Sequence, residues 1–158
     1  MNKERIAIIR LRGNVNVSGK IEDTLRMLKL YRKNYCTIIS NTPSNLGMLN
    51  KIKDYVTFGP ISDETFAKLL ENRGEITKKQ KVSDEYVKKK TKLSIKDFTK
   101  EYMSFKKELK DIPGLKRFFR LHPPIKGFER DGIKKPYSTG GSLGYRGEKV
   151  NELLMRMI

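Results

Sequence analysis

Cysteine, histidine and tryptophan are almost absent from this sequence of 158 residues, which contains one cysteine, one histidine and no tryptophan. A single cysteine excludes an internal disulfide, and without a Cys/His cluster there is no ligand set for a structural zinc ion. Cys36 lies in an apolar, strand-like run. We therefore expect it to be a small core residue rather than a nucleophile, and we predict no metal and no cofactor.

Long apolar runs are also lacking. No run approaches the roughly 20 residues that a membrane span needs. The beginning of the chain, MNKERIAII, mixes charges with a short apolar patch and has no small-residue cleavage site. Such a stretch is not typical of a signal peptide. The sequence therefore predicts a cytoplasmic protein without a membrane partner.

Motifs for catalysis and for nucleotide binding are missing too. His122 has no Ser or Cys nucleophile near it and no second ligand. The glycine-rich segment 140–147 does not have the spacing of a Walker loop. Residues 126–128 (KGF) begin like an RNA-recognition strand, but Glu129 follows where that motif has Gly or Ala. We predict no catalytic residue and no small-molecule substrate.

Acidic residues are outnumbered by basic ones, 18 against 35, which gives a formal net charge of +17. The excess is +5 in residues 1–77, +7 in residues 78–110 and +5 in residues 111–158, so it is not confined to a tail. Charge of this size opposes compaction unless a polyanion neutralises it. Nucleic acid is the first candidate for that polyanion and an anionic membrane is the second.

Apolar patterning in the first sixty residues predicts an α+β fold. Strands are expected at 5–11, 35–39 and 55–58, with helices at 18–34 and 43–53 between them. This β-α-β-α-β order favours a small sheet with its helices on one face.

The rest of the chain is expected to be mainly helical up to residue 112. Helices are predicted after Ser62, after Ser83 and over 94–109, with an exposed turn or β-arm at 78–81 and a last helix over 150–157. The lysine-rich region 88–110 is either a solvated helix face or a phosphate contact. We divide the chain into a β-α-β-α-β core (1–60), a helical lysine-rich extension (61–112) and a basic Gly/Pro/aromatic arm closed by a helix (113–158), which together form one domain.

The stretch 117–147, here called the basic strip, is the most distinctive part of the sequence. It holds six of the twelve glycines, three of the six prolines and seven Lys/Arg against two acids. That much Gly and Pro excludes a helix. Its aromatic residues (Phe119, Phe128, Tyr137 and Tyr145 among them) set it apart from a disordered tail and could stack on unpaired bases.

These features nominate a set of RNA-binding residues at the end of the first strand, in the loop after it and along the basic strip. The candidates are Arg10, Arg12, Lys20, Arg117, Arg120, His122, Lys126, Phe128, Arg130, Lys134, Lys135, Tyr137, Tyr145 and Arg146.

Several stretches resemble a known family. They include RLRG at 10–13, GMLNKIKDYVTFG at 47–59, LLENRG at 69–74, FRLHPPIKGF at 119–128 and GIKKPYSTGGSLGYRG at 132–147. Over essentially the whole chain the sequence resembles large-subunit ribosomal protein number thirty in its long archaeal form, which is related to eukaryotic large-subunit protein number seven. The basic N-terminal extension of eukaryotic members is missing, which favours an archaeal source.

The resemblance implies a ferredoxin-like, three-stranded antiparallel sheet with the first strand in the centre. It also implies a non-catalytic, structural role in the large ribosomal subunit, with large-subunit rRNA, the neighbourhood of 5S rRNA and adjacent ribosomal proteins as partners. Two alternatives stay open. One is a phosphate-handling enzyme that uses the loop 12–19, and the other is a module that binds acidic proteins or membranes.

Overall fold

The computed structural model describes residues 4–77 and 80–158. Its strands are β1 Arg5–Arg10, β2 Tyr35–Ser40, β3 Val56–Pro60, β4 Glu75–Ile76, β5 Gln80–Lys81, β6 Phe119–Arg120 and β7 Gly144–Tyr145. Its α-helices are α1 Gly19–Met27, α2 Pro43–Ile52, α3 Asp63–Arg73, α4 Asp84–Thr91, α5 Ile95–Met103 and α6 Val150–Met157. Short 3₁₀ turns lie at η1 Leu109–Asp111, η2 Tyr137–Thr139 and η3 Gly147–Lys149. Within these described ranges, no helix is long and apolar enough to cross a bilayer.

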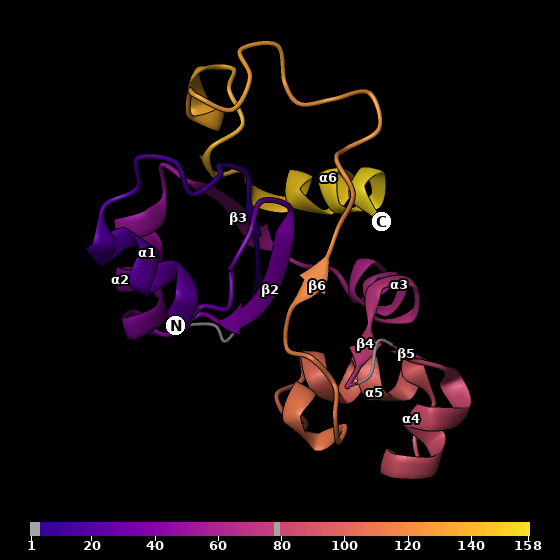
Figure 1. Cartoon of the computed structure of the whole chain (residues 1–158). Coiled ribbons are helices and arrows are strands. Elements are labelled where there is room, and N and C mark those ends of the chain that lie inside the picture. Colours follow the sequence, from indigo (N-terminus) through magenta and orange to yellow (C-terminus); the bar gives the residue numbers. More distant parts are fainter. Residues whose placement is uncertain (1–3, 78–79) are drawn as a thin grey trace.

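The predicted three-stranded core is present, with β1 in its centre (Figure 1). β1 pairs antiparallel with β2 on one side and with β3 on the other. The full sheet is larger than the prediction, because its order is β6-β2-β1-β3-β7. β6 pairs antiparallel with β2, whereas β7 runs parallel to β3, so the sheet is mixed. Both added strands come from the basic strip.

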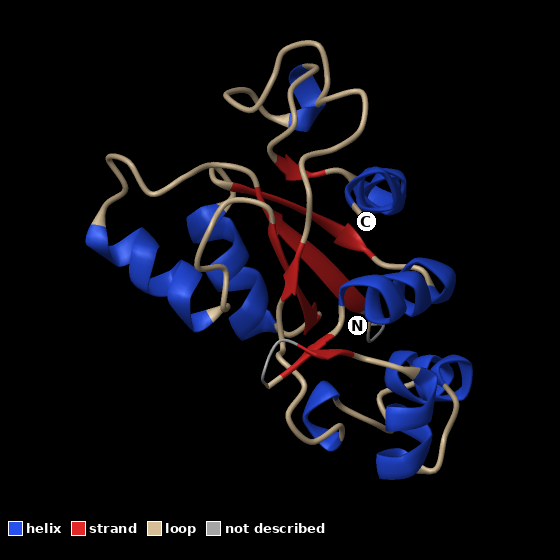
Figure 2. Ribbon diagram, turned by 45° about the vertical axis from the view of Figure 1, so that its right-hand side comes forward, coloured by secondary structure: helices blue, strands red, loops and turns tan. Residues whose placement is uncertain are grey.

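Helices cover both faces of the sheet (Figure 2). The helices α1 and α2 of the β-α-β-α-β core lie together on one face, as expected, and α3 and α6 from the later segments cover the other face. Successive residues of β1 point to opposite faces. Ile6 and Ile8 pack with residues of α1 and α2, while Ala7 and Ile9 pack with residues of α3 and α6. A strand buried on both sides has a continuous apolar run in its sequence, and here that run is IAII at 6–9, with an arginine at each end of the strand.

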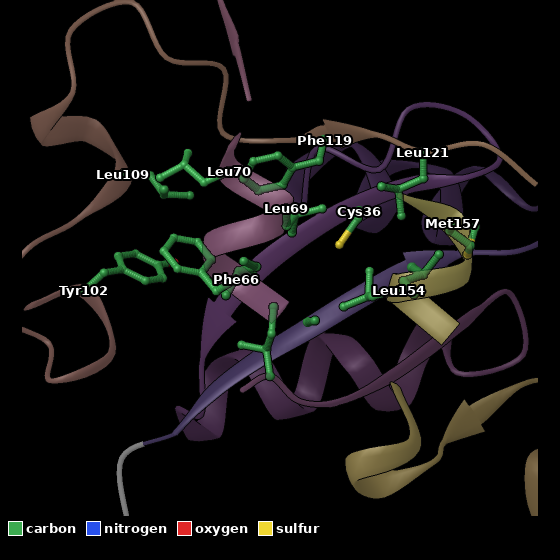
Figure 3. Packing of buried hydrophobic residues seen from close by; sticks show 14 of the residues in the cluster. Cys36, Phe66, Leu69, Leu70, Tyr102, Leu109, Phe119, Leu121, Leu154 and Met157 are labelled. Carbon is green, nitrogen blue, oxygen red and sulfur yellow. The ribbon is translucent and has the colours of Figure 1, made fainter. Parts of the chain in front are cut away.

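The larger core lies between the sheet and helices α3, α5 and α6 (Figure 3). Phe66 and Tyr102 stack with ring centroids 4.5 Å apart. Cys36 is fully buried in this cluster, as predicted, and burial raises the pKa of its thiol. Burial also raises the pKa of Tyr102, to about 12.

Side-chain caps begin several helices where the sequence predicts them. The hydroxyls of Thr42, Ser62 and Ser94 each accept a hydrogen bond from the backbone N–H three residues later. Two helices are shorter than predicted. α1 ends at Met27 and α5 at Met103, and a residue with positive φ follows each within two positions (Lys29, 60°; Phe105, 61°). The left-handed backbone turns the chain away before the apolar periodicity ends.

The exposed turn or β-arm predicted at 78–81 lies partly outside the described residues, which omit 78 and 79. Gln80–Lys81 form β5, which pairs antiparallel with β4.

The basic strip follows an irregular path between two regions of core (Figures 1 and 2). It enters through β6, extends beyond the sheet as a loop and returns through β7 to η3 and α6. On the way out, the N–H groups of His122 and Ile125 donate to carbonyls of Met157 and Arg156 in α6. Both ends of the loop are therefore attached to the same body.

Candidate nucleic-acid interface

A group of aromatic rings and arginines lies where β6 joins β2. The rings of Tyr35 and Phe118 are stacked, with centroids 5.2 Å apart and an interplanar angle of 7°, and Tyr31 meets Phe118 edge-on at 5.6 Å. The guanidinium carbon of Arg120 lies about 6 Å from both stacked rings. Tyr31, Tyr35, Phe118 and Arg120, together with exposed Arg117, are here called the aromatic edge cluster. Rings flanked by cations provide both stacking and phosphate contacts for an unpaired nucleotide.

An internal ion pair holds the far part of the basic strip in shape. Arg146 is buried and binds Glu129 through two parallel hydrogen bonds of 2.8 and 3.1 Å. The hydroxyl of Ser142 donates to the same carboxylate, and Arg146 also donates to the hydroxyl of Thr57 in β3 at 2.8 Å. The loop is thereby fastened to the sheet.

These contacts also set the charge state of Glu129. Partial burial works to raise the pKa of this carboxyl group, but the hydrogen bonds from Arg146 and Ser142 outweigh it. The pKa therefore lies below its ordinary value of 4.5, and Glu129 is ionised at neutral pH.

Most of the nominated Lys, Arg and His side chains of the basic strip point away from the core. Arg117, Arg120, His122, Lys126, Arg130, Lys134 and Lys135 are exposed. Of the nominated rings, Tyr145 is 62% exposed, whereas Phe128 packs against the core cluster and Tyr137 lies under the Arg146 guanidinium at 4.8 Å. The exposed set combines charge with one exposed ring, Tyr145, which lies beside the Phe58 ring with 5.7 Å between centroids.

Two nominated arginines point inward instead. Arg10 is 1% exposed and donates hydrogen bonds to the carbonyls of Leu30, Arg12 and Gly13 at 2.7–3.2 Å. Burial lowers the pKa of this guanidinium from its ordinary value. Arg10 thus ties two loops to the end of β1, as Arg146 ties the basic strip to β3. Both guanidinium groups are buried and bonded to groups of the protein, so we omit both arginines from the proposed RNA contacts.

The loop after β1 carries the two other nominated cations. The Arg12 guanidinium lies 5.0 Å from the Tyr55 ring and donates to the carbonyl of Asp54, and the side chain is half-buried. Lys20 is exposed at the start of α1. Val15, between them, is 86% exposed.

Sequence reasoning did not find Tyr31, Tyr35 or Phe118 as site residues. The predicted helix 18–34 contains Tyr31 and the predicted strand 35–39 contains Tyr35. Of the two neighbouring phenylalanines, only Phe119 is named among the rings for base stacking. Phe119 is fully buried, whereas Phe118 is half-buried and its ring stacks on Tyr35. A signal was available in the pattern FFR, because alternation in an edge strand turns only one of two neighbouring rings inward. Within the described part of the chain, no three His, Cys, Asp or Glu side chains gather to hold a metal ion.

Comparison with known proteins identifies the family. The family model described as ribosomal protein L30p/L7e matches residues 6–56, from β1 to the start of β3. The large ribosomal subunit protein uL30 of Methanopyrus kandleri is 56% identical over 149 residues, which is 94% of this chain and all of that protein. The chain belongs to the ribosomal protein L30p/L7e family.

Other uL30 proteins give the same result. The large ribosomal subunit protein uL30 of Nanoarchaeum equitans is 48% identical and that of Archaeoglobus fulgidus 49% identical, each over 152 residues, or 96% of this chain and 97–98% of theirs. These relatives extend through the basic strip and α6, beyond the region that the L30p/L7e model matches. The family resemblance seen in the sequence is therefore confirmed. A ribosomal protein family is not an enzyme family, which removes the alternative of a phosphate-handling enzyme.

Proposed function

We propose that this chain is a structural constituent of the large ribosomal subunit and binds large-subunit rRNA through two surfaces of the basic strip. The first is the aromatic edge cluster, and the second is the group of exposed cations on the loop between β6 and β7. Arg12 and Lys20 extend the contact to the loop after β1. The ribosome in the cytoplasm is then where the protein works.

The aromatic edge cluster is the observation that supports RNA most directly. Exposed lysines alone are common on soluble proteins and often only improve solvation. Stacked rings flanked by Arg117 and Arg120 are harder to explain without a ligand that has both flat faces and negative charge. Unpaired nucleotides of a folded RNA have both.

The loop between β6 and β7 suits a role in shape recognition. Its backbone is held by the Arg146–Glu129 pair, so its exposed cations are presented from a preformed frame. Phosphate contacts from such a frame position a protein on RNA without reading its sequence. We further propose, from the family resemblance, that this surface lies near 5S rRNA and that neighbouring large-subunit proteins are additional partners.

Binding to large-subunit rRNA fragments at increasing salt tests the proposal. If about six phosphates are neutralised, the logarithm of the binding constant should fall with the logarithm of salt concentration with a slope of about −4 to −5. The protein should also sediment with large subunits and be released by high salt. A flat salt response, or sedimentation apart from large subunits, would contradict the proposal, and fragments with and without 5S rRNA test the finer placement.

A further inference from the structure

A cavity of about 290 Å³ opens at the edge of the sheet, beside the aromatic edge cluster. Its floor is the part of β2 beyond β6, because the β2–β6 ladder pairs only Tyr35 and Cys36, whereas the stretch 37–40 lines the cavity. One wall comes from the end of α1 and from Met48 of α2. The other comes from Tyr102 of α5 and from η1. This space, here called the edge cavity, thus lies between the two helical layers.

The charges around the edge cavity are unbalanced. Three cations and one acid line it: Arg5, Lys29, Arg117 and Glu108. Glu108 is matched by Arg5, whose Nη2 atom lies 3.8 Å from its Oε1 atom. Within the described residues, no carboxylate forms an ion pair with Lys29 or Arg117. Burial and the nearby charge of Arg117 lower the pKa of Lys29. Two uncompensated cations that repel each other provide a place for an anion.

Thr37, whose hydroxyl is buried, is one of the residues that line the same cavity. Thr37 is 3% exposed, and its Oγ1 atom has no hydrogen-bond partner among the described residues. Such groups are rare in folded proteins, because burying a hydroxyl without a partner is unfavourable. An anion in the cavity would accept its hydrogen.

The backbone of β2 offers a second donor. The N–H of Asn41 donates to Glu4 across the β1–β2 pair at 2.9 Å, and the register continues from there along both strands. In an antiparallel ladder the backbone N–H groups of a strand point alternately to its two neighbours. The N–H groups of Ile39 and Thr37 therefore point to β1, and the N–H of Ile38 points to the outer edge of the sheet. β6 ends before it reaches Ile38.

We propose that the edge cavity binds a phosphate group of RNA, with Lys29 and Arg117 neutralising its charge while the Thr37 hydroxyl and the Ile38 N–H donate to its oxygens. The inference rests on the proposed rRNA-binding function and adds a specific pocket to it. Arg117 is followed directly by Phe118, so the stacked rings adjoin the cavity. This adjacency favours a nucleotide over an acidic peptide, because base and phosphate of one strand would be held together.

Amide chemical shifts of the full-length protein test the pocket directly. Inorganic phosphate, uridine monophosphate, a uridine tetranucleotide and a tetraglutamate peptide are titrated separately while the Thr37 and Ile38 signals are followed. We expect the tetranucleotide to shift both signals at lower concentration than phosphate does. Shifts caused by phosphate but not by the tetranucleotide would show a free-anion site, and shifts caused only by tetraglutamate would show a protein-binding edge. Either result overturns the proposal.

Substitutions at Lys29 and Thr37 test whether the charge and the hydroxyl group at the cavity contribute to binding. Lys29→Gln should weaken tetranucleotide binding by about tenfold and reduce the salt slope for rRNA fragments by about 1. Lys51→Gln, at an exposed lysine of α2 that does not line the cavity, is the matched control and should change neither. Thr37→Val should weaken tetranucleotide binding severalfold. Thr37→Ser keeps the hydroxyl group and should bind the tetranucleotide like the wild-type protein.

The outcomes distinguish this pocket from the wider function. In one outcome the wild-type protein binds rRNA with a steep salt slope, but the amide signals of Thr37 and Ile38 do not shift and Lys29→Gln binds like Lys51→Gln. The proposed phosphate pocket is then wrong, and the proposed function stands. If the wild-type protein does not bind rRNA at all, the proposed function fails, and any phosphate-induced shift then shows only a free-anion site.

Discussion

At the scale of single residues, arginine serves two purposes in this molecule, and the direction of the guanidinium decides which. Arg10 and Arg146 are buried and bind carbonyl, carboxylate and hydroxyl groups of the protein. Arg117 and Arg120 belong to the surface, on or beside aromatic rings. The guanidinium group suits both environments because it keeps its charge and offers five donors.

The contrast between the two kinds of arginine can be measured. Arg10→Gln should lower the free energy of unfolding by about 3 kcal/mol, because it leaves buried carbonyls such as that of Leu30 without a charged donor. Arg120→Gln should leave the unfolding temperature unchanged and reduce the salt slope of rRNA binding by about 1. Thermal unfolding and binding titrations on both variants check this. Equal effects of the two substitutions on stability would contradict the distinction.

The acid stability of the protein should depend on Glu129. Its pKa is lowered in the folded state, so its contribution to stability is complete above the ordinary value of 4.5 and disappears as the pH falls through the lower, folded-state pKa. Glu129→Gln should therefore destabilise the protein at pH 7 and flatten the loss of stability below pH 4.5.

The measurement for Glu129 is urea unfolding across the acid range. Asp131→Asn is the control, because Asp131 pairs with Lys135 at the exposed surface, where an ion pair contributes little. If the free energy of unfolding of Glu129→Gln depends on pH in the same way as that of the wild-type protein, this carboxylate is not the cause of the acid sensitivity.

At the scale of elements, the return of the chain from the basic strip depends on a close backbone approach. A Cβ atom added to Gly59 of β3 would overlap the carbonyl oxygen of Gly147 in η3. The next backbone contact is ordinary, since the N–H of Arg146 donates to Phe58 at 3.0 Å. Only glycine at this position of β3 allows η3, and the helix α6 behind it, to approach the sheet this closely.

Two glycine substitutions should therefore have opposite effects. Gly59→Ala should lower the free energy of unfolding by about 2 kcal/mol or more, because backbone has to move to accommodate the methyl group. Gly47→Ala should raise it by about 0.5–1 kcal/mol, since this helical glycine has nothing within 4 Å of the added atom. Chemical denaturation of both variants checks the pair, and a neutral Gly59→Ala would show that η3 is not held against β3.

At the scale of the whole molecule, the three segments predicted from the sequence share one core. The larger hydrophobic cluster contains Ile9 from the first segment, Phe66 and Phe98 from the second, and Leu121 and Leu154 from the third. β6 and β7 then add third-segment strands to the first-segment sheet. We therefore continue to propose one domain rather than three.

A single domain should unfold in one cooperative step. Scanning calorimetry of the full chain should show one transition with equal calorimetric and van't Hoff enthalpies. The experiment is done at moderate salt, because a net charge of +17 favours expansion when it is unscreened. Two resolved transitions, or loss of the basic strip to protease while the sheet stays folded, would contradict the single domain.

Local patterns in the sequence determined much of this protein. Continuous apolar runs identified β1, β2 and β3, and the hydroxyl residues at 42, 62 and 94 began helices where capping chemistry requires them. The charge excess and the composition of the basic strip indicated a polyanionic partner. Each of these signals depends on neighbours in the chain, so it can be read without knowing the fold.

Only the tertiary structure decided how distant segments meet. The strands β6 and β7 are two residues each and have no pattern of their own, because pairing with β2 and β3 creates them. The inward direction of Arg10 and Arg146 depends on partners brought by other elements. The stacking of Tyr35 on Phe118 and the cavity shared by Lys29 and Arg117 join residues more than eighty positions apart. Contacts between distant segments carry no local signal, so the site that best supports the function could not be read from the sequence.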